Sequence, residues 1–304
     1  MSGKKAEKQK ISSRWIVVML IDVIVIAAGI TGILLVKVDH TRSDEVYEDA
    51  VEQFVVETPG VSEDAGELVY TDDEEGEGED ADDGEAEVNG KVEPADIYGK
   101  DVASRNDSPS VPWDQRIDVN FDGLKKVNPD IVGWIFFESE TISYPILHGT
   151  DNNEYLRTTY TGLKATAGSI FIDAQSNVDF TDSHTIVYGH NMNNLSMFGK
   201  LKYYEKVNGY FDGHKYFQII TPTERYRYEV FAYREVPADD PIYTLYRDGG
   251  EQFGQFITDS ILKDSLVNSS RTVDGGSSIV TLSTCSKGGK RFVVSGVMVD
   301  AASD

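Results

Sequence analysis

The chain has 304 residues and a formal net charge of −24 at pH 7, and hydrophobic residues make up 40% of it. This length suits one domain with extensions or two small domains, and the apolar content is enough for a sizeable core. The charge is uneven: residues 1–40 carry +3, residues 41–100 carry −19 and residues 101–304 carry −8. No basic face is available to neutralise phosphates, which argues against a nucleic-acid-binding protein. Cys285 is the only cysteine, which excludes disulfide scaffolds and zinc motifs built on cysteine pairs.

The N-terminus is predicted to cross a membrane. Residues 1–14 form a basic tail, and residues 15–36 form an apolar run in which Asp22 is the only charge. As a helix with a rise of about 1.5 Å per residue, this run would span about 33 Å, enough for a bilayer. Asp22 lies near the basic end, where a carboxylate costs less than at mid-bilayer. The basic flank predicts a cytoplasmic N-terminus and an extracellular position for the rest of the chain.

A cleaved signal peptide is the alternative to this anchor. The apolar run is longer than the usual apolar core of a signal peptide, and residues 33–36 continue it beyond the small residues Ala27, Ala28 and Gly29. These two features favour an uncleaved signal anchor, and therefore a single-pass protein of the cell membrane.

Residues 37–110 are predicted to form an acidic, disordered linker. Residues 72–87 read DDEEGEGEDADDGEAE and show no apolar periodicity of a strand or a helix. Such a segment repels itself and cannot bury enough apolar surface to offset its conformational entropy. Calcium binding is the alternative, but the order of ligands and glycine in an EF-hand loop is missing. We therefore interpret the segment as a solvated tether.

Residues 111–304 are predicted to form the folded domain. A short helix ending in a turn is expected at residues 124–130, and the spacing of apolar residues from Glu251 to Leu266 predicts one long helix. Many strands with few helices favour a mostly β fold, a barrel with added helices, over a doubly wound sheet. Eight runs rich in Val, Ile, Tyr and Phe predict the strands: Ile131–Phe136, Ser143–Leu147, Gly168–Ile172, His184–Tyr188, Tyr216–Ile220, Tyr226–Val236, Ile279–Cys285 and Phe292–Val299.

Three reactive side chains lie at the ends of predicted strands. Cys285 ends one strand, and the turn SKGGK separates it from Arg291, which begins the next. A hairpin of this kind can bring the two residues close together. Lys287 and Lys290 add positive potential, which favours a thiolate. His190 follows the strand His184–Tyr188, a place where functional residues are common.

These residue types suit nucleophilic catalysis. A thiolate is a strong nucleophile, and a neighbouring imidazolium can stabilise it and later protonate a leaving amine. An arginine can donate hydrogen bonds to the oxyanion that forms on a substrate carbonyl. Taken singly, each residue has a plainer interpretation: a buried apolar cysteine, a structural histidine and a surface charge. His148 also follows a predicted strand and is the alternative base.

At these residues the sequence resembles the sortases, and their class B branch in particular. The matching segments are TLSTC ending at Cys285, RFVVSG beginning at Arg291 and TIVYGHNM around His190. Supporting segments are LKKVNPDIVGWI at 124–135, ISYPILHGTDNNEYL at 142–156 and AGSIFID at 167–173. The resemblance covers about residues 115–300, the whole predicted domain. Papain-like proteases place their cysteine before their histidine, which disfavours that family.

The resemblance implies a fold and an activity. The fold is the eight-stranded sortase-type β-barrel, with N-terminal helices and one long helix before the cysteine strand. The activity is that of a cysteine transpeptidase: Cys285 attacks the sorting signal of a secreted protein and forms a thioester. His190 is then the general acid and base, and Arg291 holds the substrate and its oxyanion. No metal or organic cofactor is implied.

The resemblance also implies partners and a substrate groove. Asn152, Leu156 and Ser283 match groove positions, and Ile242 does so more weakly. The substrates would be surface proteins with a sorting signal, and the acceptor an amine of a peptidoglycan precursor. Two departures stand out: only five residues separate Cys285 from Arg291, and the acidic tether is long.

Two other functions remain open from the sequence. The same chemistry with a lysine acceptor would polymerise pilin subunits, and the residues do not separate the two acceptors. A wall-facing binding or scaffold domain with an inactive site is the third interpretation. The intact Cys285, His190 and Arg291 argue against it.

Overall fold

The computed structural model describes residues 31, 38–39, 41–58, 111–267, 269–285 and 289–303, with Cys285 described through its backbone. Among these residues, no helix is both long and apolar enough to cross a membrane. The predicted basic tail and anchor lie outside the described residues except for Thr31, and so do residues 59–110 of the predicted linker. For those segments the expectations stay predictions.

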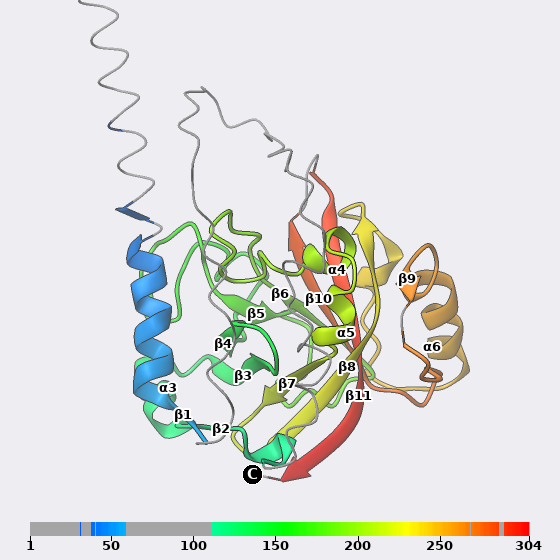
Figure 1. Cartoon of the computed structure of the whole chain (residues 1–304), viewed down its shortest axis with the longest axis horizontal. Helices are drawn as coiled ribbons and strands as arrows, with labels where there is room; N and C mark the ends of the chain where they lie inside the picture. Colours follow the sequence, from blue (N-terminus) through cyan, green and yellow to red (C-terminus); the bar gives the residue numbers. More distant parts are fainter. Residues whose placement is uncertain are drawn as a thin grey trace, which may run out of the picture.

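Eight strands close into a barrel, which confirms the predicted mostly β fold (Figure 1). The order around the barrel is β11-β10-β6-β5-β4-β3-β7-β8, and β8 pairs back to β11. The β10–β6 and β4–β5 pairs are parallel and the others are antiparallel. The strands are β3 (Ile131–Phe137), β4 (Ser143–Leu147), β5 (Ile170–Ile172), β6 (His184–Tyr188), β7 (Tyr216–Ile220), β8 (Glu224–Val236), β10 (Ile279–Cys285) and β11 (Arg291–Ser303).

Alternation of side chains along the strands divides the apolar residues into two clusters. Val280 and Leu282 of β10 belong to the main core, with Trp134 and other large buried side chains. Ile279 belongs to a second cluster, which also contains Phe253 of the helical segment before β10. Strand residues two apart lie on the same face of a sheet, so each strand of this region serves both layers.

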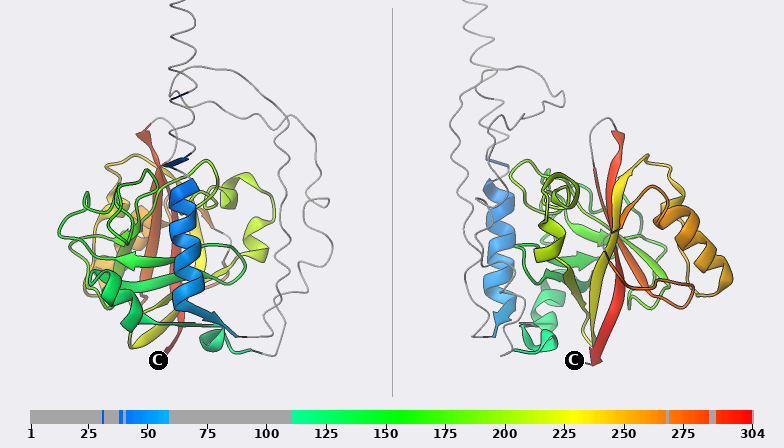
Figure 2. Two further views of the ribbon diagram at one scale, coloured as in Figure 1. Left: turned by 90° about the vertical axis from the view of Figure 1, so that its left-hand side faces the viewer. Right: turned by 45° about the vertical axis from the view of Figure 1, so that its right-hand side comes forward.

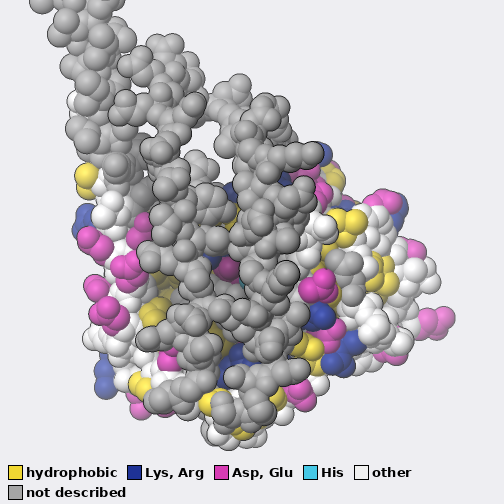
Figure 3. Space-filling view, viewed as in Figure 1, with side chains coloured by type: hydrophobic (Ala, Val, Ile, Leu, Met, Phe, Trp, Pro, Cys, Tyr) yellow, Lys and Arg dark blue, Asp and Glu magenta, His cyan; other side chains and the backbone are white. Residues whose placement is uncertain are grey.

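A helix over residues 41–54, here called the N-terminal helix, packs against the barrel. Ser43, Tyr47, Ala50 and Phe54 form its buried stripe, at the spacing expected for one helix face. Strand β1 (Val55–Glu57) follows and pairs with β2 (Ile117–Val119). The prediction of a disordered linker from residue 37 is therefore wrong for residues 41–57. Its acidic residues are on the outer face of the helix, where Figure 3 shows magenta side chains at the left, while its apolar residues are buried.

Short helices complete the decoration of the barrel. Asn120 caps α3 (Phe121–Val127), because its side-chain oxygen accepts a hydrogen bond from the Gly123 N–H at 2.9 Å. This confirms the short helix expected before residue 128. The others are η2 (Trp113–Gln115), α4 (Tyr203–Lys206), α5 (Tyr210–Gly213) and η3 (Pro241–Tyr243).

The helix before the cysteine strand is shorter than predicted. It comprises α6 (Glu251–Phe256) and the π-helical turn η4 (Ile257–Ile261), and lies across the barrel from the N-terminal helix (Figure 2). The expected extension to Leu266 is wrong. Asp264 takes a left-handed conformation with φ of 58°, which a helix cannot continue through. Leu266 then begins the short strand β9 (Leu266–Val267), which pairs with β8.

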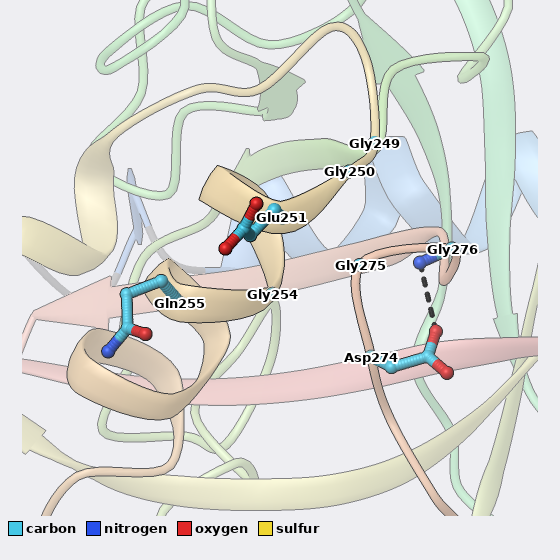
Figure 4. A pocket seen from close by; sticks show the side chains of 8 residues that line it. All are labelled: Gly249, Gly250, Glu251, Gly254, Gln255, Asp274, Gly275 and Gly276. Atoms are coloured by element: carbon cyan, nitrogen blue, oxygen red, sulfur yellow. Dashed lines mark hydrogen bonds between the residues drawn. The ribbon is translucent and has the colours of Figure 1, made fainter.

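Close-packed glycines hold the start of α6 against the segment that leads into β10. The Gly250 N–H donates to the Gly275 carbonyl at 2.8 Å, beside a shallow hollow (Figure 4). A Cβ atom on Gly275 would lie 2.1 Å from the Gly250 carbonyl oxygen. Only a residue without a side chain fits there. Gly276, the next residue, has room: its Cβ would meet nothing closer than 3.4 Å.

His184 is fully buried beside the second apolar cluster, where its ring centroid lies 5.3 Å from that of Phe256. Its Nδ1 lies 2.8 Å from the Thr244 carbonyl oxygen, and its Nε2 lies 2.8 Å from the Thr281 hydroxyl. A carbonyl can only accept, so Nδ1 carries the proton and Nε2 accepts from Thr281. Burial lowers the pKa of His184 from 6.5 to about 4. The ring is therefore neutral in the folded protein at neutral pH.

The buried His184 should make stability depend on pH. Between pH 6.5 and about 4 the unfolded chain binds a proton that folded His184 does not. This stabilising contribution is complete above pH 6.5 and is lost as pH falls, at about 1.4 kcal/mol per pH unit and about 3 kcal/mol in total. Urea unfolding at several pH values should show this slope in the wild type and a smaller one in His184→Gln. Equal slopes would contradict the assignment.

The close contact between Gly250 and Gly275 predicts unequal effects of two neighbouring substitutions. Gly275→Ala should lower the free energy of unfolding by about 1–3 kcal/mol, because the new methyl group collides with backbone. Gly276→Ala is the matched control and should change it by less than about 0.5 kcal/mol. Thermal and urea unfolding of both variants measure the difference. A Gly275→Ala variant as stable as Gly276→Ala would contradict the prediction, because the backbone at the Gly250–Gly275 contact would then have moved apart without cost.

Candidate active site

The barrel register brings the three candidate catalytic residues to one end of neighbouring strands. In the parallel β6–β10 pair, Tyr188 lies opposite Ser283, and the Gly189 N–H donates to the Ser283 carbonyl at 3.1 Å. Cys285 ends β10 two residues beyond that pair, and His190 follows the end of β6 by the same two residues. In the antiparallel β10–β11 pair, Cys285 lies directly opposite Arg291. The backbone thus assembles what the sequence only suggested.

His190 is oriented by one strong hydrogen bond. Its Nε2 lies 2.6 Å from the Leu156 carbonyl oxygen. Because a carbonyl can only accept, Nε2 carries a proton, which leaves Nδ1 as the ring atom able to exchange one. Burial lowers the pKa of His190, and the positive charges of Arg157 and Arg291 lower it further, while the bond to Leu156 acts in the opposite direction. The combined effect favours a neutral imidazole with a fixed tautomer.

Arg291 is a half-buried cation that contacts the backbone of its own turn. Its Nη1 lies 3.1 Å from the Lys290 carbonyl oxygen and 3.5 Å from that of Gly289. Within the described part of the chain it forms no ion pair with a carboxylate. Its charge reaches both His190 and Tyr188: burial lowers the pKa of His190 and Arg291 lowers it further, whereas burial raises the pKa of Tyr188 and Arg291 opposes that rise. The guanidinium therefore creates positive potential at the end of β6 and β10 and can still donate to an anionic or carbonyl group.

The four candidate groove residues have different surroundings. Leu156 has an exposed side chain and bonds His190 through its carbonyl. Ser283 is buried, and its hydroxyl lies 2.9 Å from that of Tyr243. The Asn152 amide is engaged at both ends: its nitrogen donates to Asp173 and its oxygen accepts from the Ala174 N–H, each at 2.8 Å. Ile242 is 1% exposed within the second apolar cluster and presents no surface to a substrate here.

A buried carboxylate joins several of these residues. Asp173 is 7% exposed, and its Oδ2 accepts from Asn152 Nδ2 at 2.8 Å and from the Tyr188 hydroxyl at 3.0 Å. The Tyr188 ring in turn stacks on Tyr243, with 6.4 Å between ring centroids. The sequence motifs contained Asp173 and Tyr188 but gave no sign of this connection, since the pairing arises only when β5 meets β6.

The alternative base, His148, has a different environment. Its Nε2 lies 3.2 Å from the Ala174 carbonyl oxygen, and it forms no hydrogen bond with His190 or Arg291. The hollow between α6 and residues 274–276 is also separate from the candidate residues. It lies near Ser183, which precedes β6, whereas His190 follows that strand. Among the described residues, no group of His, Cys, Asp and Glu side chains is arranged to hold a metal ion.

The Asp173 network should be measurable as coupled stability. Asp173→Ala leaves Asn152 and Tyr188 without their acceptor and should cost about 1–3 kcal/mol of unfolding free energy. In a double-mutant cycle with Tyr188→Phe, the two losses should fall short of additivity by about 0.5 kcal/mol or more. The exposed Asp248→Ala is the control and should cost less than about 0.5 kcal/mol. Additive losses would argue against the network.

Comparisons with known proteins agree with this geometry. The sequence model of the sortase domain matches residues 137–299. Sortase B of Listeria monocytogenes serovar 1/2a is 36% identical over 192 residues, which are 62% of this chain and 74% of the relative. The Staphylococcus aureus sortase B–substrate complex is 29% identical, has a TM-score of 0.55 and aligns over 60% of this chain and 85% of its own.

A crystal structure of sortase B complexed with Gly3 is also 29% identical, with a TM-score of 0.56 and coverage of 60% and 86%. The family model spans more than half of the chain, and the Listeria relative exceeds 30% identity over most of its own length. The chain therefore belongs to the sortase family and, within it, to the sortase B class of cysteine transpeptidases that anchor surface proteins in Gram-positive bacteria.

Proposed function

We propose that Cys285, His190 and Arg291 are the catalytic residues of this sortase, and that the acceptor is an amine of a cell-wall precursor. One observation supports the assignment of the residues: Cys285 pairs with Arg291 in the β10–β11 register, and Cys285 and His190 each follow the Ser283–Tyr188 pair of β10 and β6 by two residues. Cys285 is also the only cysteine of the chain, so a cysteine transpeptidase has no other thiol to use.

In the first half-reaction, the Cys285 thiolate attacks the carbonyl carbon of the scissile peptide bond in the sorting signal. A C–S bond forms and the carbonyl oxygen becomes an oxyanion, which the Arg291 guanidinium can stabilise. The C–N bond then breaks, and His190 gives a proton to the leaving amine. The products are a thioester on Cys285 and the free C-terminal fragment.

In the second half-reaction, an amine attacks the thioester carbonyl and loses a proton to His190. The C–S bond breaks and the thiolate is restored. The fixed Nε2–H of His190 supports this cycle, because Nδ1 alone then takes and gives the proton. The acceptor is inferred from the related sortase B complexed with Gly3, since a peptide amine is the nucleophile this step needs.

Positive charge around His190 supports a thiolate nucleophile. Arg157 and Arg291 act on the same histidine, and Arg291 has no carboxylate partner among the residues described. A cationic environment stabilises a thiolate and the oxyanion alike. It also opposes protonation of His190, so the imidazolium forms mainly when paired with the thiolate, and the two groups titrate as a pair.

We also propose that residues 15–36 anchor the enzyme in the cell membrane. The basic tail then lies in the cytoplasm and the catalytic domain lies outside, where surface proteins and wall precursors are present. The acidic segment between residues 59 and 110 would serve as the tether between the anchor and the domain.

The proposal is tested by turnover of the full-length chain. Fluorogenic peptides with candidate sorting motifs are incubated with and without triglycine, diaminopimelate-type amines or lysine peptides. Cleavage and a ligated product are expected with wall-type amines. Cys285→Ala should abolish both, and Arg291→Lys should reduce kcat/KM by about 10²-fold or more, because a single ammonium cannot replace the planar donor set. The exposed Lys126→Ala on α3, far from these residues in the chain, is the control and should stay within about twofold.

The other functions predict different outcomes. Ligation with lysine peptides alone would replace wall anchoring by pilin polymerisation. A folded chain that turns over no peptide and whose Cys285 resists alkylation would contradict catalysis and support the inactive scaffold.

A further inference from the structure

The hydrogen bond between His190 and the Leu156 carbonyl joins two irregular loops. The His190 loop (residues 190–199) follows β6, and the Leu156 loop (residues 155–169) precedes β5. Leu195 and Met197 adopt left-handed conformations, with φ of 66° and 55°. Non-glycine residues hold such conformations only when their surroundings impose them. The geometry of His190 therefore depends on whatever holds these loops.

The His190 loop rests on Tyr144 of β4. The Met197 N–H donates to the Tyr144 hydroxyl at 3.0 Å, and the Phe198 N–H donates to the His190 carbonyl at 2.9 Å. Asn191 and Met197 also form a β-bridge. Tyr144 thus fixes the returning half of the loop, and that half fixes the backbone of His190.

The Leu156 loop is fixed at its far end by Gly168 and Ser169. The Ser169 N–H donates to the Tyr155 carbonyl at 3.0 Å, and the Ser169 hydroxyl donates to the Thr158 carbonyl at 2.7 Å. Gly168 packs so closely that a Cβ on it would lie 2.3 Å from the Leu156 carbonyl oxygen. The acceptor of the His190 bond is therefore positioned by these two residues.

Tyr47 of the N-terminal helix touches both supports. Its ring meets the Tyr144 ring edge-on, with centroids 5.4 Å apart and planes at 87°. Its hydroxyl donates to the Gly168 carbonyl at 2.5 Å and lies 3.2 Å from the Ser169 hydroxyl. The side chain is 5% exposed. Three residues earlier, Asp44 accepts from Asn194 of the His190 loop at 2.8 Å.

We infer that Tyr47 is a positioning residue for the proposed reaction, and that the N-terminal helix thereby helps to set the geometry of the active centre. The inference rests on the proposed role of His190. The helix lies outside residues 137–299, which the sortase domain model covers. Tyr47 holds the Tyr144 and Gly168 supports at a fixed separation and so keeps His190 Nε2 on the Leu156 carbonyl. It touches neither substrate nor the reacting atoms.

Phe54 offers a matched control on the same helix. It is as deeply buried as Tyr47, but it packs at the other end of the helix against α3, where a Cβ on Gly123 would lie 2.8 Å from its ring. Phe54→Ala therefore weakens the docking of the helix without touching either support of the His190 bond. Tyr47→Phe is a milder probe, which keeps the ring on Tyr144 and removes only the hydroxyl.

The experiment compares full-length wild type, Tyr47→Ala, Tyr47→Phe and Phe54→Ala at a temperature well below the melting points of all four. Tyr47→Ala should lower kcat by about tenfold or more, because a misplaced catalytic group loses much of its rate. Tyr47→Phe should fall between Tyr47→Ala and wild type, and Phe54→Ala should stay within about twofold of wild type. Equal losses in Tyr47→Ala and Phe54→Ala, or no loss in either, would overturn the inference.

A second readout does not require turnover. The Nε2–H proton of His190, assigned in a ¹⁵N-histidine spectrum by its loss in His190→Gln, should exchange slowly with solvent in wild type. Its exchange should be about tenfold faster or more in Tyr47→Ala and unchanged in Phe54→Ala. The chemical-shift dispersion of the NMR spectra should show that both variants are equally well folded. Unchanged exchange in Tyr47→Ala would overturn the inference. Absence of turnover in wild type would instead contradict the proposed function, and the exchange data would still decide the role of Tyr47.

Discussion

The parallel pairing of β6 with β10 is the constraint on which the rest of this structure depends. It sets Tyr188, the last residue of β6, opposite Ser283, so that Cys285 ends β10 two residues beyond this pair and His190 follows β6 by the same two residues. A slip of one residue would move every side chain of one strand to the other face. The register is held because both faces are buried: Val187 and Leu282 lie in the main core, while His184 and Ile279 lie under α6. Closure through β8 and β11 removes the free edges that could slip.

The barrel positions the candidate residues, and the two flanking helical layers refine that arrangement. On one side, α6 and η3 cover β6 and β10 and place Tyr243 against Ser283 and Tyr188. On the opposite side, the N-terminal helix reaches the two loops that meet at the His190–Leu156 hydrogen bond. Loops are the least constrained parts of a fold. The two helical layers therefore restrain loops and side chains that the barrel strands do not hold in place.

Local pattern was a good guide to the strands and a poor guide to where helices begin and end. All eight strands of the barrel were predicted, because runs of β-branched and aromatic residues bounded by turn residues indicate a strand from the local sequence alone. Residues 41–54 were assigned to the linker because the charge of the whole segment outweighed the stripe of Ser43, Tyr47, Ala50 and Phe54. The helix from Glu251 was extended too far because Asp264 carries no sign in the sequence of the left-handed conformation that ends it.

The mostly β architecture, the family and the candidates Cys285, His190 and Arg291 could be predicted from the residues alone, since short motifs at strand ends carry that information. The arrangement and the support of those three residues could not, because they depend on how distant segments pack. The tautomer of His190, the Asp173 network, the burial of Ile242 and the contact of Tyr47 with both loops all join residues far apart in the chain. Such contacts depend on strand register and barrel closure, and no local pattern of residues encodes them.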